Sequence, residues 1–317
     1  MCVLKNFAKR FILYIKKQAG ERSAAKKDGR IMKKMKVAVV GYGGMGGWHT
    51  EKLLKSDVAE LAGIYDIRRE RNELAESRGI HAYGSLRELL QDSEVELVTV
   101  AVPNDAHEDV VVKALNAGKN VICEKPVALS LESLNRMIEA AEKNHVHFST
   151  HQNRRWDVDY LAMKQVHDSG ELGKVINIES RIHGSRGIPS DWRGEKVHGG
   201  GMLYDWGVHL IDQMLDLIPG KITQISADMK CAVNKSVDDY FRILLYFDNG
   251  LAAEIELGTF LLKKLPRWYV AGDTGTLVVE NIKADEGAIY RAKEFREALP
   301  KTVKNIDAGP TRTFSVK

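Results

Sequence analysis

The chain has 317 residues, of which 44% are hydrophobic and 28% are charged, a composition typical of water-soluble globular proteins. This length predicts about two domains, because a domain usually holds roughly 100 to 200 residues. Three widely separated cysteines, Cys2, Cys123 and Cys231, exclude a disulfide-stapled fold and offer no paired metal ligands. We therefore expect a reducing, cytoplasmic setting.

The net charge of +4 conceals a basic extension, residues 1–34, at the start of the chain. Residues 1–36 hold twelve Lys or Arg against only Glu21 and Asp28, so the rest of the chain is mildly acidic. A basic amphipathic surface helix is one interpretation, but the apolar run Phe11 to Ile15 is too short for a signal peptide or a membrane span. We interpret the extension as disordered or as sequence upstream of the true start, and we expect neither a membrane nor a nucleic-acid partner.

Residues 35–150 alternate between apolar runs and amphipathic stretches. Four runs, "KVAVV", "LAGIY", "ELVTVAV" and "NVIC", predict buried strands. Helices are expected between them, one following Asn104 and closed by Gly118, and one capped by Ser130 and running through Glu142. This alternation predicts a parallel sheet covered by helices on both faces.

The pattern changes in residues 151–317. One helical stretch comes first, another begins near "GGGMLYDWGVH", and several strands follow, among them "ITQISAD", "YFRILLYF" and "LAAEIEL". The tetrapeptide "FDNG" between the last two is a hairpin signal. We expect an α+β domain with an open, mostly antiparallel sheet, whose uncovered apolar face would be buried by self-association into a dimer or tetramer.

A glycine-rich stretch, "VVGYGGMGGWHT", follows directly on the first predicted strand. Within it, Gly41, Gly43 and Gly46 form G-x-G-x-x-G, with Gly44 and Met45 between them. The first glycine permits a tight turn, the second lets a pyrophosphate approach the backbone, and the third lets helix and strand pack closely. The motif predicts a dinucleotide-binding turn, although a purely structural turn or a methyltransferase would share it.

Asp66 closes the next predicted strand, twenty residues after Gly46, where an acidic residue can bind the ribose hydroxyls of a dinucleotide. Its charge should repel a 2′-phosphate, which favours NAD over NADP. Arg68 and Arg69 lie just past the strand and could hold the additional phosphate instead, or be merely solvated. We expect NAD as the cofactor, with NADP as the alternative.

Lys125 in "CEKPVALS" stands at the carboxyl end of a predicted parallel strand. Ligands bind at this edge of an open α/β sheet. Pro126 favours an extended backbone at the residue before it and so fixes the direction from which the lysine enters. Lys125 is therefore a candidate site residue, although an isolated lysine is ordinarily a surface charge.

Asp205 and His209 in "GGGMLYDWGVHLIDQ" are four residues apart, so on a helix they share one face, which Asp212 continues. A carboxylate beside an imidazole suits proton transfer, because histidine titrates near neutrality and an acid can orient it. The alternative is a helix cap with a satisfied polar histidine. We expect no metal, because no cysteine or third histidine falls at ligand spacing.

These motifs together resemble the glucose-fructose oxidoreductase and inositol dehydrogenase family, often called Gfo/Idh/MocA. The resemblance rests on G-x-G-x-x-G with His49 following, "PNDAH", "EKP", "RRW" and "GGGMLYDWGVHLID", and it extends from about residue 35 to about residue 281. It implies a doubly wound Rossmann domain followed by an α/β domain with an open sheet. It also removes the methyltransferase alternative.

The resemblance implies roles for individual residues. Lys125 matches the family's lysine beside the nicotinamide, while Asp205 and His209 match its D-x-x-x-H pair. Further cofactor contacts are implied in "PNDAH" and "EKP", at Pro103, Asn104, His107 and Glu124. Substrate contacts are expected at Arg154, Arg155, Trp192 and Arg193, for which solvated side chains are the alternative.

On this basis we predict an NAD-dependent oxidoreductase that transfers a hydride between nicotinamide and a secondary alcohol or ketone of a sugar, cyclitol or related polyol. His209 would exchange the proton, Lys125 would stabilise the alkoxide, and Asp205 would orient His209 or bind a hydroxyl. A non-catalytic dinucleotide sensor and a redox-neutral glycosidase that uses NAD transiently stay open as alternatives. Because the chain ends at Lys317, earlier than the family pattern, we expect a truncated C-terminus.

Overall fold

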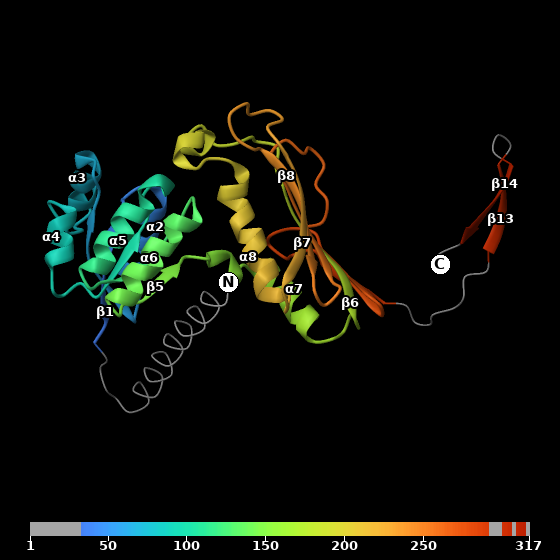
Figure 1. Ribbon diagram of the computed structural model, residues 1–317, viewed down its shortest axis with the longest axis horizontal. Coiled ribbons are helices and arrows are strands. Elements are labelled where there is room, and N and C mark those ends of the chain that lie inside the picture. The colour runs from blue at the N-terminus through green and yellow to red at the C-terminus, as the bar shows by residue number, and fades with distance from the viewer. Residues whose placement is uncertain (1–32, 292–299, 306–308, 315–317) are drawn as a thin grey trace.

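The computed structural model describes residues 33–291, 300–305 and 309–314, so the basic extension predicted for residues 1–34 lies almost entirely outside them. Two large sheets organise the described chain, one in its first half and one in its second (Figure 1). The first sheet lies within residues 35–150 and the second within residues 151–317.

The first sheet is parallel throughout and has the strand order β2-β1-β3-β4-β5. Its strands are β1 (Met35–Val40), β2 (Ala59–Tyr65), β3 (Leu97–Val100), β4 (Asn120–Cys123) and β5 (Phe148–Thr150). The connecting helices are α2 (Gly44–Leu54), α3 (Arg69–Ser77), α4 (Leu86–Gln91), η1 (Asn104–Ala106), α5 (His107–Asn116) and α6 (Leu131–Lys143). The four predicted strands are all present, whereas the short β5 was not predicted.

Both faces of the first sheet are covered by apolar side chains. Val39 of β1 packs in a buried cluster with Ile64. Its neighbours along the strand, Ala38 and Val40, belong to a different cluster that includes Met137 of α6. Because successive strand residues point to opposite faces, the two clusters lie on opposite sides of the sheet. The doubly wound Rossmann arrangement is therefore confirmed.

The second sheet has the order β12-β11-β10-β6-β9-β8-β7 and is antiparallel at every pair except β6–β9. Its strands are β6 (Val175–His183), β7 (Ile222–Lys230), β8 (Tyr240–Phe247), β9 (Ala252–Gly258), β10 (Trp268–Gly272), β11 (Gly275–Val279) and β12 (Gly287–Arg291). The predicted open, mostly antiparallel sheet is confirmed, and "FDNG" joins β8 to β9 as expected. The central strand β6 was not predicted.

Short helical elements and two α-helices complete this half. They are η2 (Asn153–Trp156), α7 (Val158–Asp168), η3 (Trp192–Gly194), η4 (Lys196–His198), the π-helical η5 (Leu203–Gly207) and α8 (Val208–Leu217). Figure 1 shows α8 on the side of the second sheet that faces the first sheet. A separate two-stranded sheet pairs β13 (Pro300–Asn305) with β14 (Gly309–Phe314).

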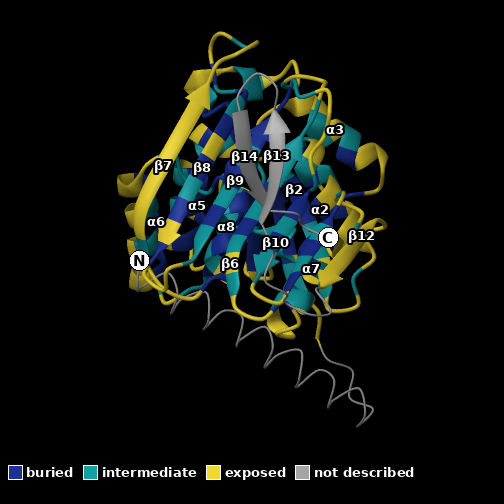
Figure 2. Ribbon diagram, turned by 90° about the vertical axis from the view of Figure 1, so that its right-hand side faces the viewer, coloured by how far each residue is buried: buried dark blue, intermediate teal, exposed yellow. Residues whose placement is uncertain are grey.

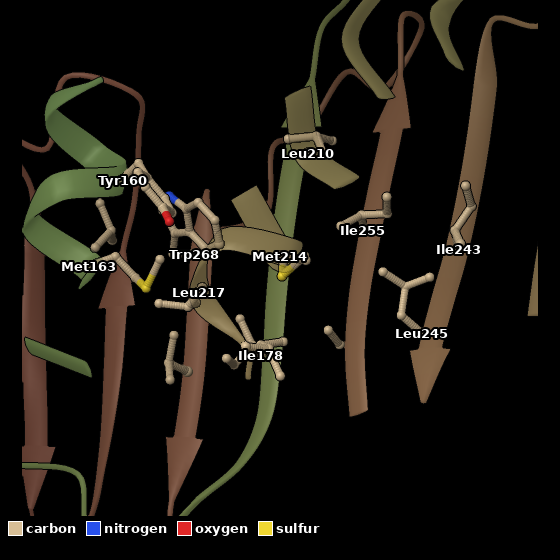
Figure 3. Packing of buried hydrophobic residues seen from close by; sticks show 14 of the residues in the cluster. Tyr160, Met163, Ile178, Leu210, Met214, Leu217, Ile243, Leu245, Ile255 and Trp268 are labelled. Carbon is tan, nitrogen blue, oxygen red and sulfur yellow. The ribbon is translucent and has the colours of Figure 1, made fainter. Parts of the chain in front are cut away.

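The core of the second half lies between these helices and the sheet (Figure 3). Met214 of α8 and Met163 of α7 are fully buried against strand residues such as Ile178. Trp268 is also fully buried, and its indole Nε1 donates to Asp159 Oδ2 at 3.0 Å, which satisfies its one polar atom. This packing holds α8, the helix that carries His209, in a fixed position.

The opposite face of the second sheet is polar. Arg242 of β8 lies 2.6 Å from Glu254 of β9, and Arg181 of β6 lies 3.5 Å from Glu256. The edge strand β7 is exposed along nearly its whole length (Figure 2). The self-association that we expected assumed an apolar face, whereas this face carries ion pairs. Within the described residues, no helix has the length and apolarity needed to cross a bilayer.

The turn that begins α2 supplies a stability prediction. At Gly46 a Cβ would lie 1.7 Å from the carbonyl oxygen of Gly41, whereas at Gly47 it would meet nothing within 4 Å. We expect Gly46→Ala to lower the free energy of unfolding by about 2 kcal/mol or more, because the backbone must shift. Gly47→Ala, the matched control, should raise it by about 0.5–1 kcal/mol. Urea unfolding of both variants checks this, and equal effects would contradict it.

Candidate functional site

The glycine-rich turn after β1 leaves space against the backbone. Gly41 has φ of +91°, and a Cβ there would lie 2.5 Å from the carbonyl oxygen of Ala101. Nothing lies within 4 Å of the Cβ positions of Gly43 and Gly44, and Met45 is only partly buried. The first turn of α2 therefore presents free N–H groups to open space, an arrangement that suits a pyrophosphate.

Asp66 follows β2 and is 6% exposed. Its Oδ2 accepts a hydrogen bond from Tyr42 N at 2.7 Å, and its Oδ1 accepts one from Arg68 N at 2.9 Å. The carboxylate thus ties the glycine turn to the end of β2. Oδ1 also accepts from Arg68 Nε at 3.5 Å, so Oδ2 is the oxygen that keeps a lone pair for a ribose hydroxyl.

The two arginines next to Asp66 already pair with carboxylates. Arg68 Nε lies 3.5 Å from Asp66 Oδ1, and Arg69 Nε lies 2.7 Å from Glu73 Oε1. A 2′-phosphate would have to compete with these partners, which supports NAD. A cavity of about 360 Å³ opens beside Asp66, with Tyr83 in its wall. Its walls come from the end of β2, from α3 and from residues 82–84, and none of its lining residues belongs to the glycine turn.

Lys125 and Asp205 meet across the two halves of the chain. Lys125 Nζ lies 2.6 Å from Asp205 Oδ1 and 2.7 Å from the Asp205 carbonyl oxygen. Both side chains are mostly buried, at 17% and 14% exposed. Burial alone would raise the pKa of Asp205, but the charges of Lys125 and Arg193 outweigh it and lower that pKa. The Asp205 carboxylate therefore stays ionised at neutral pH.

Asp205 lies on η5, a single π-helical turn that continues into α8. The turn is held at its start by Asp238, whose Oδ2 accepts from Leu203 N at 2.7 Å. A π-turn carries an additional residue, so it rotates Asp205 relative to the α-helix that follows. The three side chains predicted to share a face, Asp205, His209 and Asp212, each have a different partner. That Asp205 orients His209 or binds a hydroxyl stays a prediction, since the described hydrogen-bond partner of the His209 ring is Gln152.

His209 is 4% exposed, and its Nδ1 lies 2.9 Å from Oε1 of Gln152. Burial lowers its pKa to about 3, assisted by the positive charges of Lys125 and Arg154. The imidazole is therefore neutral at physiological pH. Gln152 was not predicted from the sequence, although it follows β5 at the carboxyl edge of the first sheet, where ligands bind.

The predicted substrate residues divide into two groups. Arg154 stacks its guanidinium 4.5 Å from the centre of the Trp206 ring, beside the catalytic helix. Arg193 lies with its Nε 3.5 Å from Asp205 Oδ1, and it also stacks on Trp192. Arg155 is different, because both oxygens of the Asp212 carboxylate accept from it, at 2.6 and 2.7 Å. Its Nε and Nη2 are occupied by this pair and its Nη1 lies 3.5 Å from Asp216, so the substrate contact expected of Arg155 stays a prediction.

The "PNDAH" motif holds loops together. Asn104 is buried, and its Nδ2 donates to the carbonyl oxygen of Gly199 in the second half, at 3.2 Å. His107 is fully buried, with Nδ1 2.9 Å from Pro126 O and Nε2 3.0 Å from Val102 O. Both ring nitrogens of His107 are thus occupied by backbone oxygens, and neither is free for the cofactor contact that we expected. Pro103, by contrast, is exposed.

Glu124 lies in a buried cluster that the sequence did not predict. His49 Nε2 lies 2.7 Å and His151 Nδ1 2.9 Å from the same oxygen, Oε1. These three ligand-type atoms lie within 4.8 Å of one another, a donor set that Zn²⁺ accepts. Both imidazoles are already at hydrogen-bond distance from the carboxylate, however, so a hydrogen-bonded cluster accounts for the contacts. Sequence motifs alone gave no signal for this cluster, because its residues come from separate segments of the chain.

Comparison with known proteins adds a family assignment to this geometry. Residues 35–152 match the model of an oxidoreductase family with an NAD-binding Rossmann fold, described as GFO_IDH_MocA. Residues 160–278 match the model of the C-terminal domain of the same family. The two matched regions contain the glycine turn and Lys125 in one case, and Asp205 and His209 in the other.

Individual relatives agree with the family models. A crystal structure of an NAD-binding protein from Listeria innocua superimposes with a TM-score of 0.78 and is 43% identical, covering 81% of this chain and 76% of that one. The myo-inositol 2-dehydrogenase of Thermotoga maritima is 28% identical over 87% of this chain and 89% of its own length. An uncharacterized oxidoreductase of Schizosaccharomyces pombe is 41% identical, but this chain spans only 47% of its length.

The Lys125–Asp205 pair yields a prediction on stability. Asp205→Asn would leave the mostly buried ammonium without a counter-charge, so we expect a loss of about 1–3 kcal/mol in the free energy of unfolding at pH 7. Because the folded pKa of Asp205 lies below its unfolded value, this contribution should be constant above about pH 4 and disappear as pH falls further.

Urea unfolding between pH 3 and pH 8 measures this contribution. Asp109→Asn is the matched control, because Asp109 pairs with Lys113 on an exposed helix face, at 2.7 Å. It should cost no more than about 0.5 kcal/mol. Equal losses for the two variants, or a loss at Asp205 that does not change with pH, would contradict the assignment.

Proposed function

The chain belongs to the Gfo/Idh/MocA family of oxidoreductases, and from this premise we propose that it is a dehydrogenase of sugars, cyclitols or related polyols. The observation that carries the proposal is the contact of Lys125 Nζ with Asp205 at 2.6 Å, with His209 one turn further on. This contact brings an ammonium from the nucleotide-binding half to the helix that supplies the imidazole. The inositol dehydrogenases among the relatives support a cyclitol as substrate class.

The cofactor site fits NAD. The glycine turn offers N–H groups for a pyrophosphate, and Asp66 offers carboxylate oxygens for ribose hydroxyls. Bound NAD supplies the acceptor for the hydride that leaves the alcohol carbon. The arginine–carboxylate pairs beside Asp66 favour NAD over NADP. We therefore include NAD in the proposed function, because these backbone and side-chain groups would hold it.

Oxidation of a secondary alcohol breaks its C–H and O–H bonds and forms a ketone. The hydride goes to the cofactor, and the hydroxyl proton must go to a base. We assign that proton to His209, because its neutral imidazole can accept it. A base of low pKa is a weak one, so it needs help. Lys125 provides this help, since its ammonium stabilises the developing alkoxide.

Asp205 and Arg193 define the charge around the lysine. The carboxylate holds Lys125 Nζ at 2.6 Å and so directs it toward the second half, and Arg193 Nε lies 3.5 Å from the same oxygen. Arg154 lies on the other side, against Trp206. We propose that Arg154, Arg193 and Trp192 contact the hydroxyl groups of the substrate that do not react. The three cations, Lys125, Arg154 and Arg193, each pair with a carboxylate, so the local charge is balanced, which suits an uncharged polyol.

We also propose the division into a nucleotide-binding domain, residues 35–150, and a substrate domain, residues 151–317. The buried clusters support it, since each one, with its partly buried neighbours, is confined to one of these ranges. Assembly into a dimer or tetramer is a proposal as well. The face of the second sheet opposite α8 carries ion pairs, so such an assembly would not rest on a purely apolar sheet face.

Activity measurements test the proposed function. Purified protein should produce reduced nicotinamide when it is screened against cyclitols, polyols and sugars with NAD or NADP. Lys125→Met and His209→Gln should each lower kcat by about 100-fold or more, the lower end of the effect of a positioned proton-transfer group. Lys113→Met removes a lysine from an exposed helix face and should leave kcat unchanged.

The same screen separates the alternatives. A redox-neutral glycosidase would cleave a glycoside without releasing reduced nicotinamide. A non-catalytic sensor would bind NAD and turn over nothing. Wild-type kcat in the Lys125→Met or the His209→Gln protein would overturn the residue assignment even if the enzyme is a dehydrogenase.

A further inference from the structure

One amide oxygen determines the hydrogen-bonding state of His209. Oε1 of Gln152 lies 2.9 Å from Nδ1 of the imidazole. A carbonyl oxygen only accepts hydrogen bonds, so Nδ1 must carry the ring hydrogen. A neutral imidazole has a single ring hydrogen, and Nε2 therefore keeps its lone pair. The contact selects one of the two neutral tautomers, the one in which Nε2 can accept a proton.

The backbone around Gln152 is well fixed. Gln152 N donates to Thr150 O at 3.0 Å, and the preceding residue, His151, donates from its backbone N to Cys123 O at 2.8 Å. Arg155 N donates in turn to Gln152 O at 3.3 Å. The amide thus projects from the segment that leaves β5 and enters the second half of the chain. Such a placement makes it a rigid partner for a side chain on α8.

The charges near His209 make this partner necessary. Lys125 and Arg154 act on the ring as cations, while Asp205 and Glu124 act as anions. Within the described part of the chain, none of these four groups hydrogen-bonds to the ring, and Asp205 is engaged by Lys125. Burial, assisted by the two cations, keeps the ring neutral but does not choose its tautomer. The choice therefore falls to Gln152.

We propose that Gln152 sets the tautomer of His209 and so leaves Nε2 as the atom that exchanges a proton with the substrate hydroxyl. The inference rests on the proposed function of His209 in hydride transfer. Gln152 is a positioning residue in this account, because it contacts the base and not the reacting atoms. It also takes the orienting role that the sequence had assigned to Asp205.

Nitrogen NMR of protein labelled with ¹⁵N at histidine tests the tautomer without any turnover. The signals of His209 are identified by their loss in His209→Gln. At pH 7 we expect a protonated, pyrrole-type Nδ1 and an unprotonated, pyridine-type Nε2. Gln152→Leu should replace this pattern by averaged signals. A protonated Nε2 in the wild type would overturn the proposal, since the amide would then be donating from its NH₂ group. This result is independent of whether the protein is a dehydrogenase.

Kinetics separate positioning from a merely structural role. Gln152→Leu should lower kcat by roughly 10- to 100-fold with little change in KM. The upper figure is the smallest loss expected when a general base is removed altogether. Gln152→Glu keeps an acceptor oxygen and adds a negative charge, so it should restore most of kcat and move the acidic limb of the pH profile upward. Gln165→Leu, at an exposed position of α7, is the control and should behave as wild type. Equal impairment by Leu and Glu would overturn the proposal.

A second, independent observation concerns the residue before Lys125. Glu124 is 5% exposed and receives His49 and His151 on Oε1, while its Oε2 accepts from Lys125 N at 3.2 Å. Burial alone would raise the pKa of Glu124, but the hydrogen bonds from the two histidines outweigh it and lower that pKa. The carboxylate therefore stays ionised and ties the backbone of Lys125 to α2 and to the segment after β5.

We infer that His49 and His151 hold Glu124 as an anion that positions Lys125, in place of the cofactor contact expected of Glu124. Glu124→Gln should lower kcat by roughly 10-fold and leave the Kd for NAD, measured by fluorescence titration, within 2-fold of wild type. A weakened Kd with unchanged kcat would overturn this inference in favour of a cofactor contact. A rise in Tm on adding one equivalent of Zn²⁺ to wild type, absent in Glu124→Gln, would overturn it in favour of a metal centre.

Discussion

The ion pair between Lys125 and Asp205 is the interaction on which the rest of the site depends. It joins the carboxyl edge of the first sheet to the helix that packs on the second sheet, and both partners are mostly buried. Asn104 with Gly199 and Asp105 with His198 add polar contacts between the same two regions, at 3.2 Å each. Together these contacts hold the two regions against each other. In the proposed function, a substrate bound here would meet the ammonium from one half and the imidazole from the other.

This pairing also explains the charge state of the neighbouring groups. The ammonium of Lys125 helps to keep His209 neutral, although burial is the larger cause of its low pKa. The two histidines around Glu124 have the opposite effect on a carboxylate, which stays ionised although it is buried. Two cations, Lys125 and Arg154, and two anions, Asp205 and Glu124, thus act on the His209 ring. In the proposed function, this arrangement keeps an uncharged base beside a charged stabiliser of the alkoxide, as oxidation of a neutral alcohol requires.

Much of this architecture could be predicted from the sequence, because the strands of the first sheet are buried on both faces and appear as unbroken apolar runs. β6 was missed because one of its faces is polar, so that Glu179 and Arg181 interrupt the apolar residues. At the site, the positions of Lys125 and His209 followed from motifs, but their partners did not. Gln152 lies 57 residues from His209 along the chain, and Glu124 lies 75 residues from His49. The prediction that residues four apart share a face assumes a regular α-helix, and it does not hold across the π-turn of η5.

The central claim is that Lys125 and His209 act on a single hydroxyl group of the substrate. A crystal structure of the protein with NAD and a polyol that it oxidises tests this most directly. We expect one hydroxyl oxygen at about 2.6–3.2 Å from both Lys125 Nζ and His209 Nε2, with its carbon facing C4 of the nicotinamide. A reacting hydroxyl that contacts only one of these two atoms, or a nicotinamide ring that lies away from both, would contradict the account.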